Sequence, residues 1–268
     1  MSETKIMLGN AAIARGAYEA GVKVASAYPG TPSTEVSENL VQYKDALYCE
    51  WAPNEKVATE VAIGASISGV RAMCCMKHVG VNVAADPLYS ISYAGVGGGL
   101  VMVAADDPGL YSSQNEQDTR CVARAAQVPV LEPSDSQEAK DFTKLAFELS
   151  EKYDTPVILR TTTRLAHSQG PVLLEERIER APLEYTRNAA KFVLMPGNAK
   201  GRHVFVEERM KKMAEDASSM TINRAEYGDT SIGFIASGIA YQYVKEVCPD
   251  ASVLKLGLVH PLPRRLIE

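Results

Sequence analysis

The residues best suited to chemistry lie in the run from Ala52 to Gly69. Asn54 is a suitable N-cap residue, which places Glu55 in the first turn of the helix that follows. Small side chains and glycines recur at helical spacing along this run, so one face of the helix is bare and a ligand or backbone could approach it closely. The pattern predicts a carboxylate that bonds a ligand at the start of a helix. The alternative is an ordinary first-turn acid that complements the helix dipole.

Three polar turns follow predicted strands and could contribute to the same site. These turns are Pro29–Pro32, His78–Gly80 and Asp106–Pro108. Because the carboxyl ends of parallel strands meet at one edge of a sheet, we expect the turns to cluster there. Gly30 and Gly80 would admit a ligand, and Thr31 and His78 would offer polar contacts. Thr31 could equally stabilise its turn, and His78 could be a structural histidine.

Other candidate sites in the sequence are weaker. The loop from Ser112 to Asp118 is dense in donors and acceptors, and we leave open whether it binds a ligand or is a solvated surface loop. Asp106-Asp107 precedes Pro108-Gly109, so a turn explains that pair more simply than a metal does. No pair of histidines or cysteines has metal-ligand spacing, and the glycines around Gly97 precede a strand instead of joining a strand to a helix. We therefore predict neither a metal site nor a dinucleotide loop.

Runs rich in Val, Ile and Ala alternate with amphipathic segments, which indicates an α/β fold with a parallel sheet and helices on both faces. We predict six strands, over 22–28, 47–50, 71–76, 100–105, 128–131 and 157–162. Helices are expected over 11–20, from 33 or 34, from 54, and over 83–93, 120–126 and 135–152. The segments 77–82 and 106–118 are expected to be loops.

The pattern of charged and apolar residues changes near residue 166 and again near residue 230. We predict a first domain over 1–165, a linker region over 166–229 with an exposed amphipathic helix over 202–217, and a second α/β domain that begins at 230–268. Strands over 231–236 and 253–258 flank a helix ending near 247. Two strands do not make a stable domain alone, so the second domain is expected to be truncated.

Composition limits the classes of partner and location. The net charge of −5 argues against nucleic acid, which draws on clustered Lys and Arg, and favours small molecules or proteins. The five cysteines are scattered, and the N-terminus lacks the apolar region of a signal peptide, so a reducing cytoplasm fits best. The uncharged stretch between Asp86 and Asp106 is interrupted by proline and glycines, and we expect no membrane span.

Six stretches together resemble the thiamine diphosphate-dependent 2-oxoacid:ferredoxin oxidoreductases, specifically the alpha subunits of the indolepyruvate type. They are Tyr28–Glu35, Glu50–Lys56, Met76–Asn82, Ala105–Gly109, Ser112–Asp118 and Glu132–Glu138. The resemblance covers residues 6 to about 268. It implies that the first domain binds the pyrimidine of the cofactor and that the tail begins a domain like the C-terminal domain of transketolase.

The resemblance also implies roles for residues and partners. Glu55 would be catalytic, hydrogen-bonding the pyrimidine nitrogen of thiamine diphosphate and favouring the imino tautomer, with Pro29, Gly30 and Gly80 beside the cofactor. Thr31 and His78 would face the 2-oxo acid, and these two assignments are weaker. The cofactor would decarboxylate indolepyruvate or another aryl pyruvate, with electrons passing to 4Fe-4S clusters and ferredoxin and the acyl group to coenzyme A. A smaller beta subunit is the expected partner.

Parts of the family pattern are missing from this sequence. The Gly-Asp-Gly motif and the following asparagine, which hold the diphosphate and Mg²⁺, are absent, as are the cysteine clusters of the ferredoxin-like tail. We therefore expect an N-terminal portion with half of the cofactor site, inactive and weak in cofactor binding by itself. Two alternatives stay open: the same chemistry on another 2-oxo acid, such as pyruvate or a branched-chain acid, and a non-catalytic assembly module.

Overall fold

A seven-stranded sheet forms the centre of the protein in a computed structural model that describes residues 3–268. Its strand order is β12-β6-β7-β5-β4-β2-β3. The members are β2 (Val24–Ala27), β3 (Tyr48–Trp51), β4 (Ala72–Lys77), β5 (Leu100–Asp106), β6 (Val130–Leu131), β7 (Val157–Thr162) and β12 (Leu258–His260). The six predicted strands are all present and parallel to their neighbours, whereas β12 runs antiparallel to β6.

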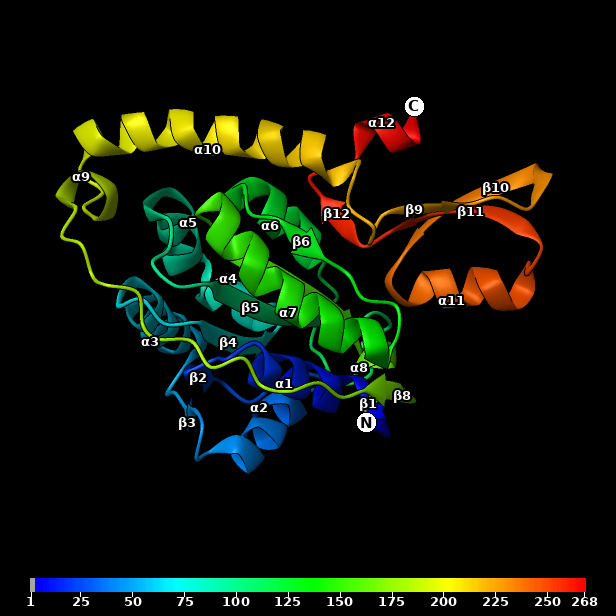
Figure 1. The fold of residues 1–268 in the computed structure, drawn as a ribbon, viewed down its shortest axis with the longest axis horizontal. Coiled ribbons are helices and arrows are strands. Elements are labelled where there is room, and N and C mark those ends of the chain that lie inside the picture. Colours follow the sequence, from blue (N-terminus) through cyan, green and yellow to red (C-terminus); the bar gives the residue numbers. More distant parts are fainter. Residues whose placement is uncertain (1–2) are drawn as a thin grey trace.

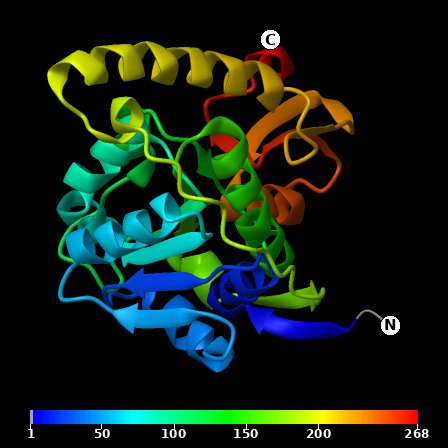
Figure 2. The same cartoon turned by 60° about the vertical axis from the view of Figure 1, so that its left-hand side comes forward.

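Helices cover both faces of this sheet, which confirms the predicted α/β class (Figures 1 and 2). One face packs against α1 (Gly9–Glu19), α2 (Thr34–Leu40) and α7 (Ser136–Tyr153). The other packs against α3 (Glu55–Ile67), α4 (His78–Val83), α5 (Ala85–Ala94) and α6 (Thr119–Ala126). Strands β4 and β5 are buried along their whole length, because both of their faces are covered. That burial explains why they read as continuous apolar runs in the sequence.

One local prediction was wrong, and two strands were not predicted. The segment 77–82 is not a loop, because the helix α4 begins at His78 directly after β4. Its glycine and β-branched residues have low helix propensity, and contacts with α3, β4 and β5 stabilise the helix instead. Helix α1 begins at Gly9, and the unpredicted strands β1 (Thr4–Leu8) and β8 (Gln169–Leu173) form an antiparallel pair outside the main sheet.

The region after β8 combines an exposed extended segment with two helices. After α8 (Thr163–His167) and β8, an extended segment crosses the amino-terminal edge of the sheet, where the backbone N–H of Leu183 donates to the carbonyl of Gly69. The chain continues through α9 (Ala189–Phe192) into α10 (Pro196–Ala217), which is longer than predicted and runs along one side of the molecule (Figure 1). Val206 and Met213 are fully buried, so α10 is not simply an exposed helix.

The last part of the chain forms a small unit beside the main sheet. Here β10 (Asp229–Ser237) and β11 (Ala251–Leu256) are parallel, β9 (Arg224–Glu226) pairs antiparallel with β11, and α11 (Gly238–Val247) joins β10 to β11. The predicted strand over 253–258 is therefore two strands, since the chain turns at Gly257 and enters the main sheet as β12, before the short α12 (Arg264–Ile267). The domain boundaries near 165 and 230 stay a prediction.

Candidate functional site

The carboxyl-terminal edge of the sheet gathers the predicted site residues. Parallel register places the end of β2 beside the ends of β3 and β4, and the end of β4 beside β5. The turn at Gly30 follows β2, Glu55 opens the helix after β3, and His78 follows β4 directly. The clustering expected from parallel strands is therefore present in the fold.

Glu55 begins α3 as predicted. The Asn54 side chain caps the helix by accepting a hydrogen bond from the backbone N–H of Val57 at 3.0 Å. Glu55 is partly buried, yet its carboxylate oxygens form no hydrogen bond or ion pair with any residue of the range 3–268. A partly buried carboxylate without a protein partner is available to a ligand that donates a hydrogen bond.

Gly80 on α4 lies directly against the Glu55 side chain. A Cβ atom added at Gly80 would lie 2.4 Å from Glu55 Oε1 and 2.6 Å from its Cγ. No other residue type fits there without moving the carboxylate. The sequence predicted that Gly80 admits a ligand, and the structure shows that it makes room for Glu55 itself.

Gly30 has a different neighbour. A Cβ atom at Gly30 would lie 3.1 Å from the Cβ of Lys77, the last residue of β4, so the turn packs on the lysine stem. The Gly30 backbone N–H donates to Thr34 Oγ1 at 2.9 Å, which fixes the turn before α2. Pro29 and Thr31 are exposed, and the Thr31 hydroxyl is not the group that stabilises the turn.

His78 is held by the loop that follows β5. The ring is buried, and its Nε2–H donates to the backbone carbonyl of Asn115 at 3.0 Å. Its Nδ1 is buried with no hydrogen-bond partner among the described residues. The Asn82 side chain on α4 also bonds this loop, donating to Gln117 Oε1 at 2.9 Å. The loop over 107–118 therefore folds back over the start of α4.

Asp107, directly after β5, organises that loop, where the sequence predicts only a turn. Asp107 accepts hydrogen bonds from the backbone of Ser112 and from the hydroxyls of Ser113 and Thr163, at 2.6–2.8 Å. Burial alone would raise the pKa of Asp107, but these donors and the nearby Lys77 ammonium lower it to about 2. Pro108 and Gly109 form the expected turn.

Asp106 belongs to a buried ionic network that ties the last part of the chain to the sheet. Arg160 donates to Asp106 at 2.7 Å and to Glu132 at 2.9 Å, and the second oxygen of Glu132 accepts from Ser237 at the end of β10. All charges of this network are paired, so it is structural. Its residues are not available to a ligand at the same edge.

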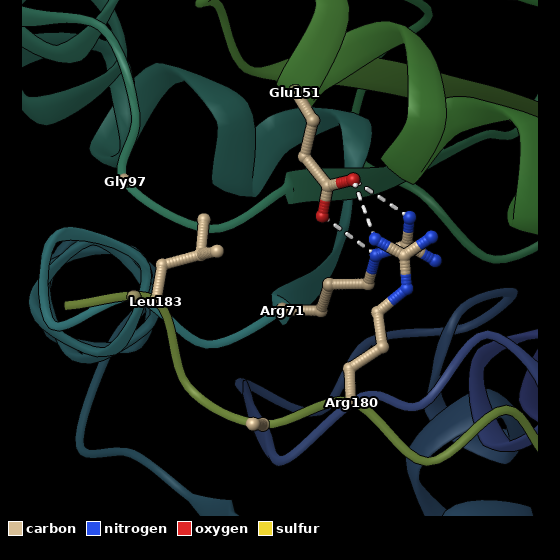
Figure 3. Close-up of a pocket in the computed structure, with 7 residues that line it drawn as sticks. Arg71, Gly97, Glu151, Arg180 and Leu183 are labelled. Atoms are coloured by element: carbon tan, nitrogen blue, oxygen red, sulfur yellow. Dashed lines mark hydrogen bonds and ion pairs between the residues drawn. The ribbon is translucent and has the colours of Figure 1, made fainter.

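Two hollows in the structure lie elsewhere. One, of about 440 Å³, is lined by Arg71, Glu151, Arg180 and Leu183 at the amino-terminal edge of the sheet, and Glu151 pairs with both arginines there (Figure 3). The other, of about 920 Å³, lies between α6, α10 and the residues after β12. Glu55 is not among the residues that line either hollow.

The residues at the edge fit half of a thiamine diphosphate site. A partly buried carboxylate at a helix start suits the pyrimidine ring nitrogen, whose N–H would donate a hydrogen bond to it in the imino tautomer. In the range 3–268 no three His, Cys, Asp or Glu side chains converge as a metal site does. Within that range, no helix is both long and apolar enough to cross a membrane.

Comparison with known proteins defines the class. Residues 15–230 match the family described as "Pyruvate flavodoxin/ferredoxin oxidoreductase, thiamine diP-bdg". The chain belongs to this thiamine diphosphate-binding family. The matched range contains Gly30, Glu55 and Gly80, whose roles stay a prediction.

Individual relatives are more specific. The chain is 49% identical to the indolepyruvate oxidoreductase subunit IorA of Archaeoglobus fulgidus, over 99% of this chain and 45% of that protein. It is 46% identical to the subunit of the same name from Pyrococcus horikoshii, over 99% of this chain and 43% of that protein. The chain thus spans a little under half the length of these relatives.

One solved structure supports the fold. A 2-oxoglutarate:ferredoxin oxidoreductase from Magnetococcus marinus superposes with a TM-score of 0.82 at 19% identity, over 98% of this chain and 55% of that chain. That protein was solved with 2-oxoglutarate, coenzyme A and succinyl-CoA bound. At this identity the likeness is evidence for the shared α/β architecture alone.

Proposed function

We propose that this chain supplies the pyrimidine-binding half of a thiamine diphosphate site in an enzyme that oxidatively decarboxylates indolepyruvate and other aryl pyruvates. The observation that carries the proposal is the Glu55 carboxylate, which opens α3, has no partner in the described part of the chain and lies against Gly80. The family match supports the cofactor, and the names of the relatives support the substrate.

The protein residues would position and activate the bound cofactor. Thiamine diphosphate supplies the carbon that attacks the keto group and holds the electrons left by the departing carboxylate. Glu55 would accept a hydrogen bond from the pyrimidine ring nitrogen and so favour the imino tautomer. Gly80 leaves room for the Glu55 side chain, and Pro29 and Gly30 would border the cofactor.

The remaining components are proposed from the relatives. They are named as subunits, so a second subunit is expected. Ferredoxin, which the family description names, and coenzyme A, which the solved structure contains, would accept the electrons and the acyl group. Mg²⁺ and the diphosphate would be held by residues outside this chain, as would 4Fe-4S clusters. Thr31 would face the 2-oxo acid, and His78 would hold the loop over 107–118 beside it. We place the enzyme in the cytoplasm.

The test is Glu55→Gln in the full-length polypeptide assembled with its partner subunit. Turnover, measured as indolepyruvate-dependent reduction of a viologen dye, should fall by roughly 10²–10⁴, the usual contribution of positioned proton transfer. Glu60→Gln is the matched control, because Glu60 is exposed on the same helix. Near-normal turnover in Glu55→Gln, or an equal loss in both variants, would remove Glu55 from the mechanism.

A further inference from the structure

Lys77 is a buried cation at the candidate site that no carboxylate among residues 3–268 pairs with directly. It ends β4, between the ends of β2 and β5, and its side chain is 9% exposed. Its Nζ donates one hydrogen bond, to the backbone carbonyl of Ser112 at 2.5 Å. Among residues 3–268 no carboxylate lies within 4.0 Å of it to form an ion pair. An ammonium has three donors, so two of them lack a protein acceptor.

The nearest acid is already committed to other donors. Asp107 lies close enough for the Lys77 charge to lower its pKa. However, its oxygens accept from the backbone of Ser112 and the hydroxyls of Ser113 and Thr163. A buried cation left without a bonded anion is costly, and such groups are usually paired. The unpaired Lys77 therefore suggests that an anion binds there.

The surroundings of Lys77 place that anion on the side of the site where Thr31 lies. The turn after β2 packs on the Lys77 stem at Gly30, the residue before Thr31. Glu55 belongs to α3, and Gly80 to α4, both on the opposite face of the sheet. The edge thus has a carboxylate side, suited to the cofactor pyrimidine, and a cationic side, suited to an anion.

Other cations near this edge are less suitable. Arg160 is fully paired with Asp106 and Glu132, and Lys56 pairs with Asp86 at 2.8 Å on the surface. Arg164, after β7, forms no ion pair in the described chain but is exposed, so water already solvates its charge. A carboxylate ligand gains more binding free energy from a desolvated ammonium than from a hydrated guanidinium.

From these contacts we propose that Lys77 binds the carboxylate of the 2-oxo acid and thereby selects anionic substrates. This inference rests on the proposed function for the identity of the anion. Lys77 holds the substrate carboxylate before the chemical step, so its loss acts mainly on KM and less on kcat.

The experiment compares an acid with an uncharged analogue of the same shape in the assembled full-length enzyme. Phenyllactate and its primary amide are suitable, because a 2-hydroxy acid lacks the keto group that reacts. Calorimetry should show that the unmodified enzyme prefers the acid by roughly 10- to 100-fold, the range for a hydrogen bond to a charged group. Lys77→Met should abolish this preference, and Lys77→Arg should restore part of it. Lys56→Met is the control and should leave it unchanged.

The outcomes separate the two claims. Equal weakening of acid and amide by Lys77→Met would overturn the inference, because it would mean that Lys77 only holds the loop at Ser112. Loss of the preference in Arg164→Met, with Lys77→Met unaffected, would overturn it as well. Failure of the unmodified enzyme to reduce viologen with any 2-oxo acid would refute the proposed function. The acid preference, measured without turnover, would still decide whether Lys77 binds an anion.

Discussion

Gly80→Ala should remove activity without weakening the fold. The added Cβ would lie 2.4 Å from Glu55 Oε1, 2.6 Å from Cγ and 2.8 Å from Cδ. Ordinary contacts between such atoms are about 3.5–4.0 Å, so the carboxylate must move by about 1 Å. A displacement of that size in a catalytic geometry costs roughly 10²-fold in rate.

The stability of this variant should change little. Gly80 lies inside α4, and its backbone is outside the left-handed region, so alanine is compatible with the helix. Alanine in place of glycine stabilises a helix interior by up to about 1 kcal/mol, which offsets part of the strain at Glu55. The midpoint of thermal unfolding should therefore change little while turnover falls.

The control for this variant is Gly64→Ala on α3, the helix that carries Glu55. A Cβ atom at Gly64 would meet no heavy atom within 4 Å. That variant should keep full turnover and gain a few tenths to about 1 kcal/mol in stability. Viologen reduction and thermal unfolding of both variants, in the assembled enzyme, are the assays. Full turnover in Gly80→Ala would refute the reasoning that Gly80 keeps Glu55 in position.

Two further predictions concern stability. Because the folded protein lowers the pKa of Asp107, this carboxylate stabilises the fold above about pH 5, and the stabilisation is lost as the pH falls toward 2. Between pH 6 and pH 3 the free energy of unfolding, measured in urea, should therefore fall by about 1 kcal/mol more in the unmodified protein than in Asp107→Asn. An equal fall in both proteins would contradict this. Glu151→Gln should destabilise the fold by about 3 kcal/mol, because its partner Arg71 is 4% exposed and pairs with it at 2.7 Å (Figure 3). Glu179→Gln, which removes a surface ion pair, should cost under about 1 kcal/mol. Equal midpoints of urea unfolding for the two variants would show that the buried pair is not needed.

Much of the fold could be predicted from the sequence because the relevant signals are local. The six parallel strands are buried apolar runs, and the N-cap at Asn54 with Glu55 behind it is a contact within one turn. Features that depend on distant partners could not be predicted. The strand β12 pairs with β6, which lies more than a hundred residues earlier, and α4 forms because its neighbours stabilise a segment of low helix propensity.

At the site, too, local features could be predicted and contacts between distant residues could not. Sequence position was enough to expect that Glu55, Gly30 and Gly80 lie at one edge of the sheet. It could not show that Gly80 packs on Glu55, because that contact joins two helices. Lys77 was missed as well, since a lysine after an apolar strand usually reaches solvent, and its burial depends on the loop that folds over it.

The most direct test of the central claim is a high-resolution structure of the assembled full-length enzyme with thiamine diphosphate bound. A Glu55 carboxylate oxygen should lie within hydrogen-bond distance, about 2.6–3.2 Å, of the pyrimidine ring nitrogen, with Gly80 still against the Glu55 side chain. A cofactor whose pyrimidine binds away from Glu55, or pairs with a different acidic residue, would contradict the account.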